Sequence, residues 1–131
     1  MWYNVLGDFM TIQGKVTSGL GVAKHWIKKI ESNFYDKTGK ELYPGTLNIK
    51  LDFDYEFKPD FVITKNEYGG EYDVYIKQCE VLENEAYIVR SEKNMNENGD
   101  YKLNIIEIMA NINFRGKYNL EDGTVIKIKL E

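Results

Sequence analysis

The stretch that decides the fold of this 131-residue chain is Tyr43-Pro44-Gly45-Thr46-Leu47-Asn48-Ile49-Lys50-Leu51. Pro44 fixes φ near the value of the second position of a type I or II turn, and Gly45 can adopt the positive φ that the third position of type II requires. After this turn, apolar and polar residues alternate with the two-residue period of a half-buried strand. The stretch therefore predicts a sharp turn that runs directly into a strand.

Two oxygen-bearing side chains, Thr46 and Asn48, share the polar face of that strand. A hydroxyl and an amide carbonyl in this arrangement suit Mg²⁺, which takes few protein ligands, keeps several waters and is otherwise held by substrate phosphates. No carboxylate is then required, because a triphosphate supplies the negative charge. An ordinary amphipathic strand after an ordinary turn explains the same residues, so the pattern leaves both interpretations open.

The composition indicates one compact, strand-rich domain covering residues 1–131. Hydrophobic residues make up 43% of the chain and aromatic residues 14%, which is typical of a folded globule rather than a disordered chain. The net charge of −4 and the pI near 5.1 argue against general binding of nucleic acid or of an anionic membrane.

We expect a soluble, cytoplasmic protein, and we expect it to be a monomer. The start of the sequence lacks the basic region and apolar run of a secretory signal, and no apolar stretch approaches the roughly 20 residues that span a bilayer. Cys79 is the only cysteine, so neither an intrachain disulfide nor a cysteine-built zinc site can form.

Short strands separated by turns account for most of the remaining pattern. The predicted strands, besides the one after Pro44, are 9–18, 61–64, 71–79, 86–90, 103–110 and 124–130. Gly69-Gly70 predicts a hairpin between the strands at 61–64 and 71–79. We expect a polar loop at 92–100 and an irregular connection at 111–116.

One helix interrupts these strands, within residues 24–38. Apolar residues, including Trp26, recur there at one-turn spacing, and Gly39 is placed to end the helix. The aromatic residues of this segment are assigned to the core. Many short strands with few helical residues predict an all-β barrel with a short helical insertion.

The segment Gly19-Leu20-Gly21 follows the first predicted strand. Unhindered glycine backbone can curl so that successive N–H groups point at an anion, which is the concave arrangement that holds phosphates. Lys24 follows at a distance suited to a phosphate. A plain turn explains the same glycines, and this alternative stays open on the pattern alone.

Two charged residues near the C-terminal end are candidates for chemistry. Glu107 stands in the middle of a strand that is apolar on both faces, where a carboxylate can act as a base or an acid. Pairing with a buried lysine or with backbone N–H groups explains Glu107 equally well. Arg115, in the connection that follows, could hold phosphate or lie on the surface without a role.

Three motifs together resemble the archaeal CTP-dependent riboflavin kinases. They are Gly14-Lys15-Val16 to Ser18-Gly19-Leu20-Gly21, the turn and strand at 43–51, and Ile105-Ile106-Glu107-Ile108. Their order and spacing match the family as well as their sequences do. The likeness runs from about Gly14 to the C-terminus, and the combination of motifs is far more specific than any one of them.

The resemblance implies a six-stranded cradle-loop barrel that transfers the γ-phosphoryl group of CTP to the ribityl 5′-hydroxyl of riboflavin, giving FMN and CDP with Mg²⁺. It implies that Thr46 and Asn48 bind the metal, and that Glu107 lies near the flavin and orients or deprotonates the attacking hydroxyl. The nucleotide-binding residues that it implies are Gly19, Leu20, Gly21, Val22, Ala23, Lys24, His25, Ile112, Asn113, Phe114 and Arg115. The preference for CTP over ATP rests on the resemblance alone, because no residue reveals a cytosine-reading edge.

The chain departs from the family pattern in two regions. After the glycine loop the family commonly has an acidic residue, a third glycine and an arginine, where this chain has Val22, Ala23 and Lys24. A lysine keeps the charge of arginine but loses its bidentate phosphate geometry. Gly99, a second implied flavin-binding position, stands roughly where the family offers a hydroxyl to the flavin phosphate.

These departures leave two alternatives to an active kinase. The first is a non-catalytic relative that binds flavin or nucleotide. The second is a barrel used for interaction with protein or nucleic acid, although the acidic balance disfavours nucleic acid.

Overall fold

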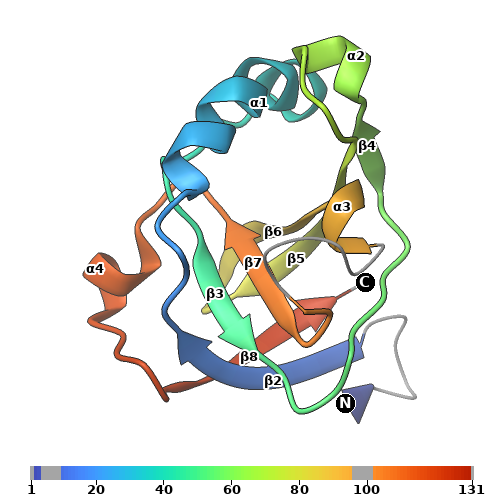
Figure 1. Cartoon of the computed structure of the whole chain (residues 1–131). Coiled ribbons are helices and arrows are strands. Elements are labelled where there is room, and N and C mark those ends of the chain that lie inside the picture. Colours follow the sequence, from blue (N-terminus) through green and yellow to red (C-terminus); the bar gives the residue numbers. More distant parts are fainter. Residues whose placement is uncertain (1, 4–9, 96–101, 131) are drawn as a thin grey trace.

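Six antiparallel strands close into a barrel in a computed structural model that describes residues 2–3, 10–95 and 102–130 (Figure 1). The strands are β2 (Met10–Thr17), β3 (Leu47–Lys50), β5 (Val74–Val81), β6 (Asn84–Ser91), β7 (Ile105–Met109) and β8 (Val125–Leu130). Around the barrel their order is β2, β3, β7, β6, β5 and β8, and β8 pairs again with β2. The predicted all-β barrel is therefore confirmed.

The other elements of the described chain are two short strands and four helices. They are β1 (Trp2–Tyr3), β4 (Phe61–Ile63), α1 (Ala23–Thr38), α2 (Lys65–Tyr68), α3 (Glu92–Met95) and α4 (Phe114–Tyr118). β4 pairs with β5, which confirms the predicted hairpin, but α2 lies within its connection. α3 begins the segment predicted as a polar loop, and α4 occupies part of the predicted irregular connection.

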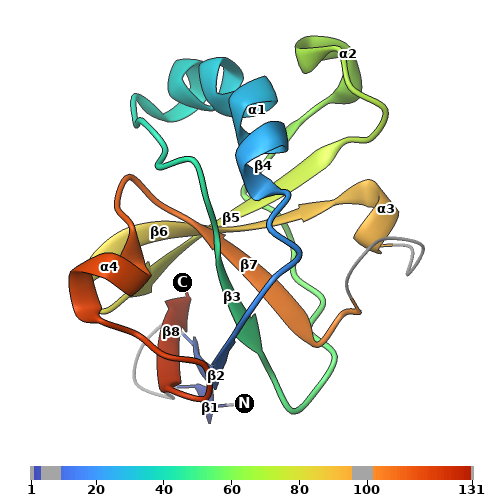
Figure 2. The same cartoon turned by 60° about the vertical axis from the view of Figure 1, so that its left-hand side comes forward.

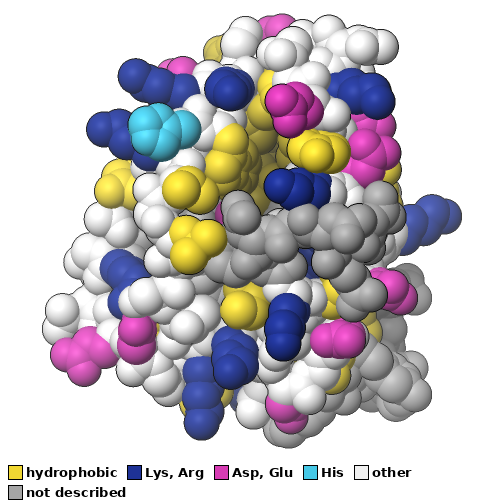
Figure 3. Space-filling model, in the orientation of Figure 1, with side chains coloured by type: hydrophobic (Ala, Val, Ile, Leu, Met, Phe, Trp, Pro, Cys, Tyr) yellow, Lys and Arg dark blue, Asp and Glu magenta, His cyan; other side chains and the backbone are white. Residues whose placement is uncertain are grey.

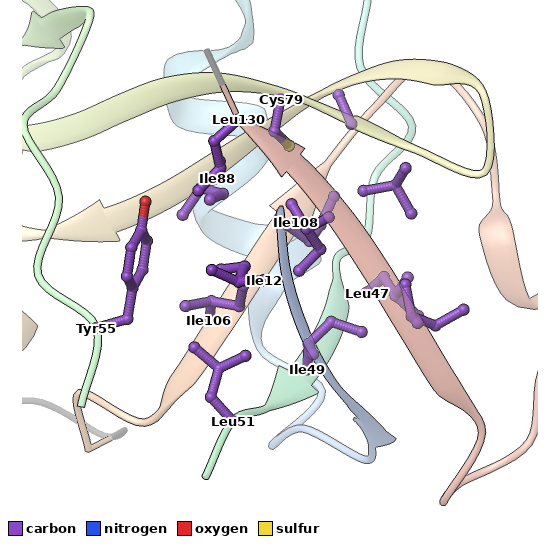
Figure 4. Packing of buried hydrophobic residues seen from close by; sticks show 14 of the residues in the cluster. Ile12, Leu47, Ile49, Leu51, Tyr55, Cys79, Ile88, Ile106, Ile108 and Leu130 are labelled. Atoms are coloured by element: carbon purple, nitrogen blue, oxygen red, sulfur yellow. The ribbon is translucent and has the colours of Figure 1, made fainter. Parts of the chain in front are cut away.

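The barrel interior is filled by aliphatic side chains (Figure 4). Alternate residues of each strand point inward, so Leu47 and Ile49 of β3 meet their partners Ile108 and Ile106 of β7 inside. The residues that alternate with them point away from the barrel interior. Gly14 of β2 passes so close to β3 that a Cβ there would lie 2.5 Å from the Lys50 carbonyl oxygen, which explains a glycine inside a strand.

Helix α1 packs on the outside of the barrel (Figure 2). Its buried residues Ile27, Ile30 and Phe34 contact a second apolar cluster, formed by Ile63, Val74, Ile76, Tyr87, Val89 and Met109 of the neighbouring strands. Gly39 ends the helix with φ 71°, and its N–H donates to the Tyr35 carbonyl. The predicted helix is confirmed, and it begins one residue earlier than expected.

Helix α2 begins with a capping box, and the carboxylate of this capping box also contacts α1. The Thr64 side chain accepts from the Glu67 N–H, and the Glu67 carboxylate accepts from the Thr64 N–H, which is a capping box. Lys37 of α1 donates to the same carboxylate at 2.9 Å. The bond from the Thr64 N–H and then that from Lys37 lower the pKa of Glu67 to about 2.

Arg90 of β6 is a buried cation that joins three segments. Its guanidinium donates to the carbonyls of Tyr55, Leu103 (3.1 Å) and Ile105 (3.3 Å), and it lies 5.4 Å from the centre of the Phe57 ring. Burial lowers the pKa of Arg90 from its ordinary value. One side chain thus ties the segment that follows β3, and the start of β7, to β6.

Replacing Arg90 with methionine is expected to lower the free energy of unfolding by about 3–5 kcal/mol, because two buried carbonyls and one part-buried carbonyl lose their donor. Denaturant unfolding followed by circular dichroism measures this loss. Replacing the exposed Lys58 with methionine is the control, with an expected change within about 0.5 kcal/mol. A loss below ~1 kcal/mol for Arg90→Met would contradict the role of Arg90 as a joint between segments.

Candidate active site

A polar row of three side chains crosses the outer face of the barrel. In the strand register Thr17 of β2 lies opposite Asn48 of β3, and Asn48 lies opposite Glu107 of β7. Directly opposed residues of antiparallel strands point to the same face, with Cβ atoms about 4.5–5.5 Å apart. Asn48 is buried and Glu107 is half-buried. Two predicted site residues from distant parts of the sequence are therefore neighbours.

Thr46 adds a second oxygen beside the polar row. Its hydroxyl donates to the Asn48 side-chain oxygen over 3.2 Å, so the two predicted metal ligands lie together. The turn before them is not the predicted type I or II turn. The Gly45 N–H donates to the Tyr43 carbonyl at 2.8 Å, which closes a three-residue turn around Pro44. Glycine is favoured at position 45 by crowding rather than by positive φ, since a Cβ would lie 3.0 Å from the Tyr43 ring.

A polar cavity of about 290 Å³ lies between the polar row and the N-terminus of α1. Its lining residues are Thr17, Ser18, Gly19, Gly21, Val22, Ala23, Lys24, Pro44, Gly45, Thr46, Asn48, Glu107 and Arg115. The structure thus brings together most of the predicted nucleotide and metal residues. Leu20 and His25 are exposed and are not among the lining residues.

The N-terminus of α1 is suited to an anion. Gly21 has φ 75°, which turns the chain into the helix, and Val22 is the N-cap residue without a side-chain cap. The side chain of Val22 therefore satisfies none of the first N–H groups, which carry the positive end of the helix dipole. Ala23 is the first helical residue, so alanine in place of the family's glycine fits the backbone here.

Arg115 is fixed in the wall of the polar cavity. Its guanidinium donates to the Thr17 carbonyl at 3.1 Å and to the Asp122 carboxylate at 2.5 Å, and the Ser18 hydroxyl donates to the other Asp122 oxygen at 2.7 Å. These bonds, that from Arg115 first, hold the pKa of Asp122 below its ordinary value. Arg115 is therefore an anchored residue of the site, and its partner Asp122 is not among the predicted site residues.

The predicted nucleotide segment 112–115 lies on the other side of the Pro44 turn. All four residues line a small cavity of about 50 Å³ that shares Gly45, Thr46 and Arg115 with the polar cavity. Phe114 is buried against the barrel core, and Asn113 caps α4 with its side chain. The two predicted nucleotide-binding segments therefore flank Thr46.

An aromatic cavity of about 200 Å³ runs along α1 on the other side of Glu107. Its lining residues are Val22, Trp26, Ile30, Tyr68, Tyr72, Val74, Val89, Arg90, Ser91, Lys93, Asn94 and Glu107. Figure 3 shows hydrophobic side chains gathered in a recess beneath α1. Flat aromatic ligands suit such walls, because aromatic side chains stack on them.

The sequence interpretation missed most of this aromatic cavity. Trp26 is assigned to the core from the sequence, whereas in the structure Trp26 is half-buried and lines the aromatic cavity. The spacing of four residues between Val22, Trp26 and Ile30 is the signal that could have grouped them on one face of α1. Gly99, the second predicted flavin-binding position, lies outside the described residues.

Glu107 and Val22 line both the polar and the aromatic cavity. The carboxylate of Glu107 is thus placed where the contents of the two cavities would meet.

Residues 16–130 match the family model CTP-dep_RFKase, which is described as a domain of unknown function, DUF120. The chain belongs to this family. The resemblance inferred from the three sequence motifs is thereby confirmed, and the residues of the polar row all lie within the part that matches the CTP-dep_RFKase family.

Similar proteins named riboflavin kinase come from several archaea. The chain is 30% identical over 136 residues to that of Methanocella arvoryzae, covering 95% of this chain and 59% of the relative. It is 32% identical to that of Methanococcus aeolicus (89% of this chain, 95% of the relative) and 32% identical to that of Methanobrevibacter smithii (92% and 99%). This chain therefore corresponds to a little over half of the first relative and nearly all of the other two.

A metal ion in this site would depend on neutral oxygen ligands. Across residues 2–3, 10–95 and 102–130, no group of three or more His, Cys, Asp and Glu side chains could hold a metal. The Thr46 and Asn48 oxygens, 3.2 Å apart at the polar cavity, are chemically suited to Mg²⁺ that brings phosphate with it.

In the described chain no helix has the length and hydropathy to cross a membrane.

Proposed function

We propose that this protein is a riboflavin kinase that transfers the γ-phosphoryl group of CTP to the 5′-hydroxyl of riboflavin, giving FMN and CDP. The observation that carries the proposal is the meeting of a polar and an aromatic cavity at Glu107. Phosphoryl transfer needs a polyphosphate and an acceptor hydroxyl in line, and two such adjacent cavities suit that arrangement. The names of the family and of the archaeal relatives support the same substrates.

The nucleotide phosphates are assigned to the polar cavity. The first N–H groups of α1 and the Lys24 ammonium place positive charge at one side of this cavity, and the Arg115 guanidinium adds positive charge from a separate segment. Because Asp122 and the Thr17 carbonyl already hold Arg115, its geometry is set before a nucleotide binds. Such preorganised charge stabilises the charge that spreads over the transferring phosphoryl group.

Thr46 and Asn48 are the proposed ligands of Mg²⁺. Their oxygens face the polar cavity from the end of the Pro44 turn and from β3. Strand pairing on both sides fixes the backbone of Asn48, and the Thr46 hydroxyl donates to its side-chain oxygen. When bound, the ion supplies charge neutralisation on the phosphate oxygens.

Glu107 is the proposed acceptor of the hydroxyl proton. With the flavin ring in the aromatic cavity, the ribityl chain would lead its 5′-hydroxyl to the junction. The bond between the γ-phosphorus and the oxygen that bridges to the β-phosphate breaks, and a new bond forms to the ribityl oxygen. The proton of that hydroxyl passes to the Glu107 carboxylate, and FMN and CDP leave.

Incubation of the protein with riboflavin, Mg²⁺ and either CTP or ATP tests the proposal directly. We expect FMN, separated from riboflavin by chromatography, with CTP and not with ATP, and none when EDTA removes the metal. FMN from ATP would keep the reaction class and overturn the choice of donor.

The second candidate function is a non-catalytic flavin- or nucleotide-binding protein. It is favoured by Lys24, which replaces the bidentate arginine of the family pattern. Quenching of riboflavin fluorescence on binding, without any FMN formed, would establish this candidate in place of the kinase.

A further inference from the structure

Two lysines lie side by side one step along the barrel from the polar row. Lys15 of β2 is directly opposite Lys50 of β3, in the same register that places Thr17 opposite Asn48. Residues two positions apart in a strand point to the same face, so both lysines project from the face that carries the polar row. Both are exposed, and Figure 3 shows basic side chains gathered over β2 and the end of β3. Lys15 and Lys50 are called the lysine pair below.

No acidic residue lies directly opposite either lysine of the pair, and the nearest carboxylate on the same face in the strand register is that of Glu107, diagonal to Lys50. Lys15 faces Val125 on β8, and Lys50 faces Ile105 on β7. The ion pairs found among the described residues are made by Lys37, Lys40, Lys77 and Arg115 and include neither lysine of the pair. Like charges directly opposite one another destabilise a sheet, and this protein has 21 acidic residues against 17 basic ones. A cationic pair that makes none of these ion pairs, on an acidic protein, favours an anionic ligand.

The position of the pair indicates which anion. Two residues of strand cover about 6.6 Å, and the four-carbon stem of a lysine spans much of that distance. The ammonium groups can therefore approach a phosphate held at the polar row. The overall charge of −4 repels a nucleoside triphosphate at long range, so local positive charge beside the cavity has a large effect on its approach.

We propose that the lysine pair is an outer phosphate-binding point that draws the polyphosphate of the nucleotide into the polar cavity without touching the reacting atoms. This inference rests on the proposed nucleotide site. It predicts that the pair governs the apparent affinity for the nucleotide, whereas riboflavin, which is neutral, is unaffected.

The double variant Lys15→Gln/Lys50→Gln tests the proposal through KM and kcat for FMN formation at two salt concentrations. We expect KM for CTP to rise about fivefold at ~20 mM salt and to differ little from that of the unmodified protein at ~500 mM, where exposed charges are screened. We expect kcat and KM for riboflavin to stay unchanged. The melting temperature should not fall, because a like-charge pair is removed.

The control is Lys28→Gln/Lys58→Gln, which removes the same charge from two exposed lysines that lie outside the strands of the polar row and, like the lysine pair, line neither cavity. An equal rise in KM for CTP in the control, a rise that persists at high salt, or no rise at all would overturn the proposal. Calorimetric binding of CTP with Mg²⁺ separates this result from the proposed function. If the unmodified protein forms no FMN but its CTP binding weakens in the same salt-dependent way in the double variant, the kinase proposal fails and the lysine pair stands.

Discussion

Replacement of Asn48 with leucine is expected to lower kcat for FMN formation by about 10²–10³-fold. Asn48 is 6% exposed and its side-chain oxygen accepts from Thr46, so leucine keeps the approximate volume and removes the oxygen. The proposed site then loses one of two protein ligands for Mg²⁺, and the phosphates lose the charge that the ion supplies. Chromatographic measurement of FMN over a range of Mg²⁺ concentrations should show no recovery at high metal.

Two measurements give this experiment its controls. Thr46→Ser keeps a hydroxyl at the neighbouring position and should retain most of the turnover. In thermal unfolding followed by circular dichroism, the Asn48→Leu variant should melt near the temperature of the unmodified protein. The reason is that the strand pairing of β3 uses the backbone of Asn48 and not its side-chain amide. Turnover unchanged in a folded Asn48→Leu protein would remove both the metal assignment and the role of Asn48.

Replacement of Glu107 with glutamine is expected to lower kcat by roughly 10²–10⁴-fold, the usual contribution of a general base. The amide has the size of the carboxylate and can still accept a hydrogen bond, so KM for riboflavin should change little. Glu107 lines both cavities and lies opposite Asn48, which places its carboxylate beside the proposed phosphate position. Steady-state rates of FMN formation, measured at saturating CTP, test the prediction.

The pH dependence of kcat distinguishes a base from a positioning residue. In the unmodified protein the rate should fall on the acid side as the carboxylate takes up a proton, and this acid limb should vanish in Glu107→Gln. Glu107→Asp keeps a carboxylate, so its kcat should still fall at acid pH, although the highest kcat should be lower than that of the unmodified protein. A Glu107→Gln protein that keeps the acid limb or the full rate would exclude Glu107 as the proton acceptor.

The parts of the fold that follow from local pattern could be predicted from the sequence. The two-residue period at Leu47, Asn48 and Ile49 gave the strand and its two faces, because burial on one side imposes alternation. The one-turn spacing of Ile27, Ile30 and Phe34 gave the helix that packs against the barrel. The side chains of Thr46 and Asn48 and the glycine loop suggested a metal and phosphate site, the resemblance supplied the full set of nucleotide-binding residues, and the structure adds that most of these residues share one cavity.

Other features could not be predicted because they depend on residues far apart in the chain. The placement of Glu107 opposite Asn48 follows from strand register, which no local pattern specifies. The turn between β5 and β6 has positive φ at Leu82 and Glu83, although neither residue type signals such a turn. The capping box of Thr64 and Glu67, in contrast, is a recognisable local signature, and it would have located α2.

Along each strand of this barrel, residues that stabilise the core alternate with residues of the opposite face, which includes the polar row. In β3 the residues that face inward are exchangeable among aliphatic side chains of similar volume, whereas Asn48 between them lines the polar cavity on the other face. Substitutions that change thermal stability can therefore be made at the inward-facing positions without altering the side chains that line the polar cavity. A designer could exploit the same division by repacking the interior for heat resistance while every residue of the polar row is kept unchanged.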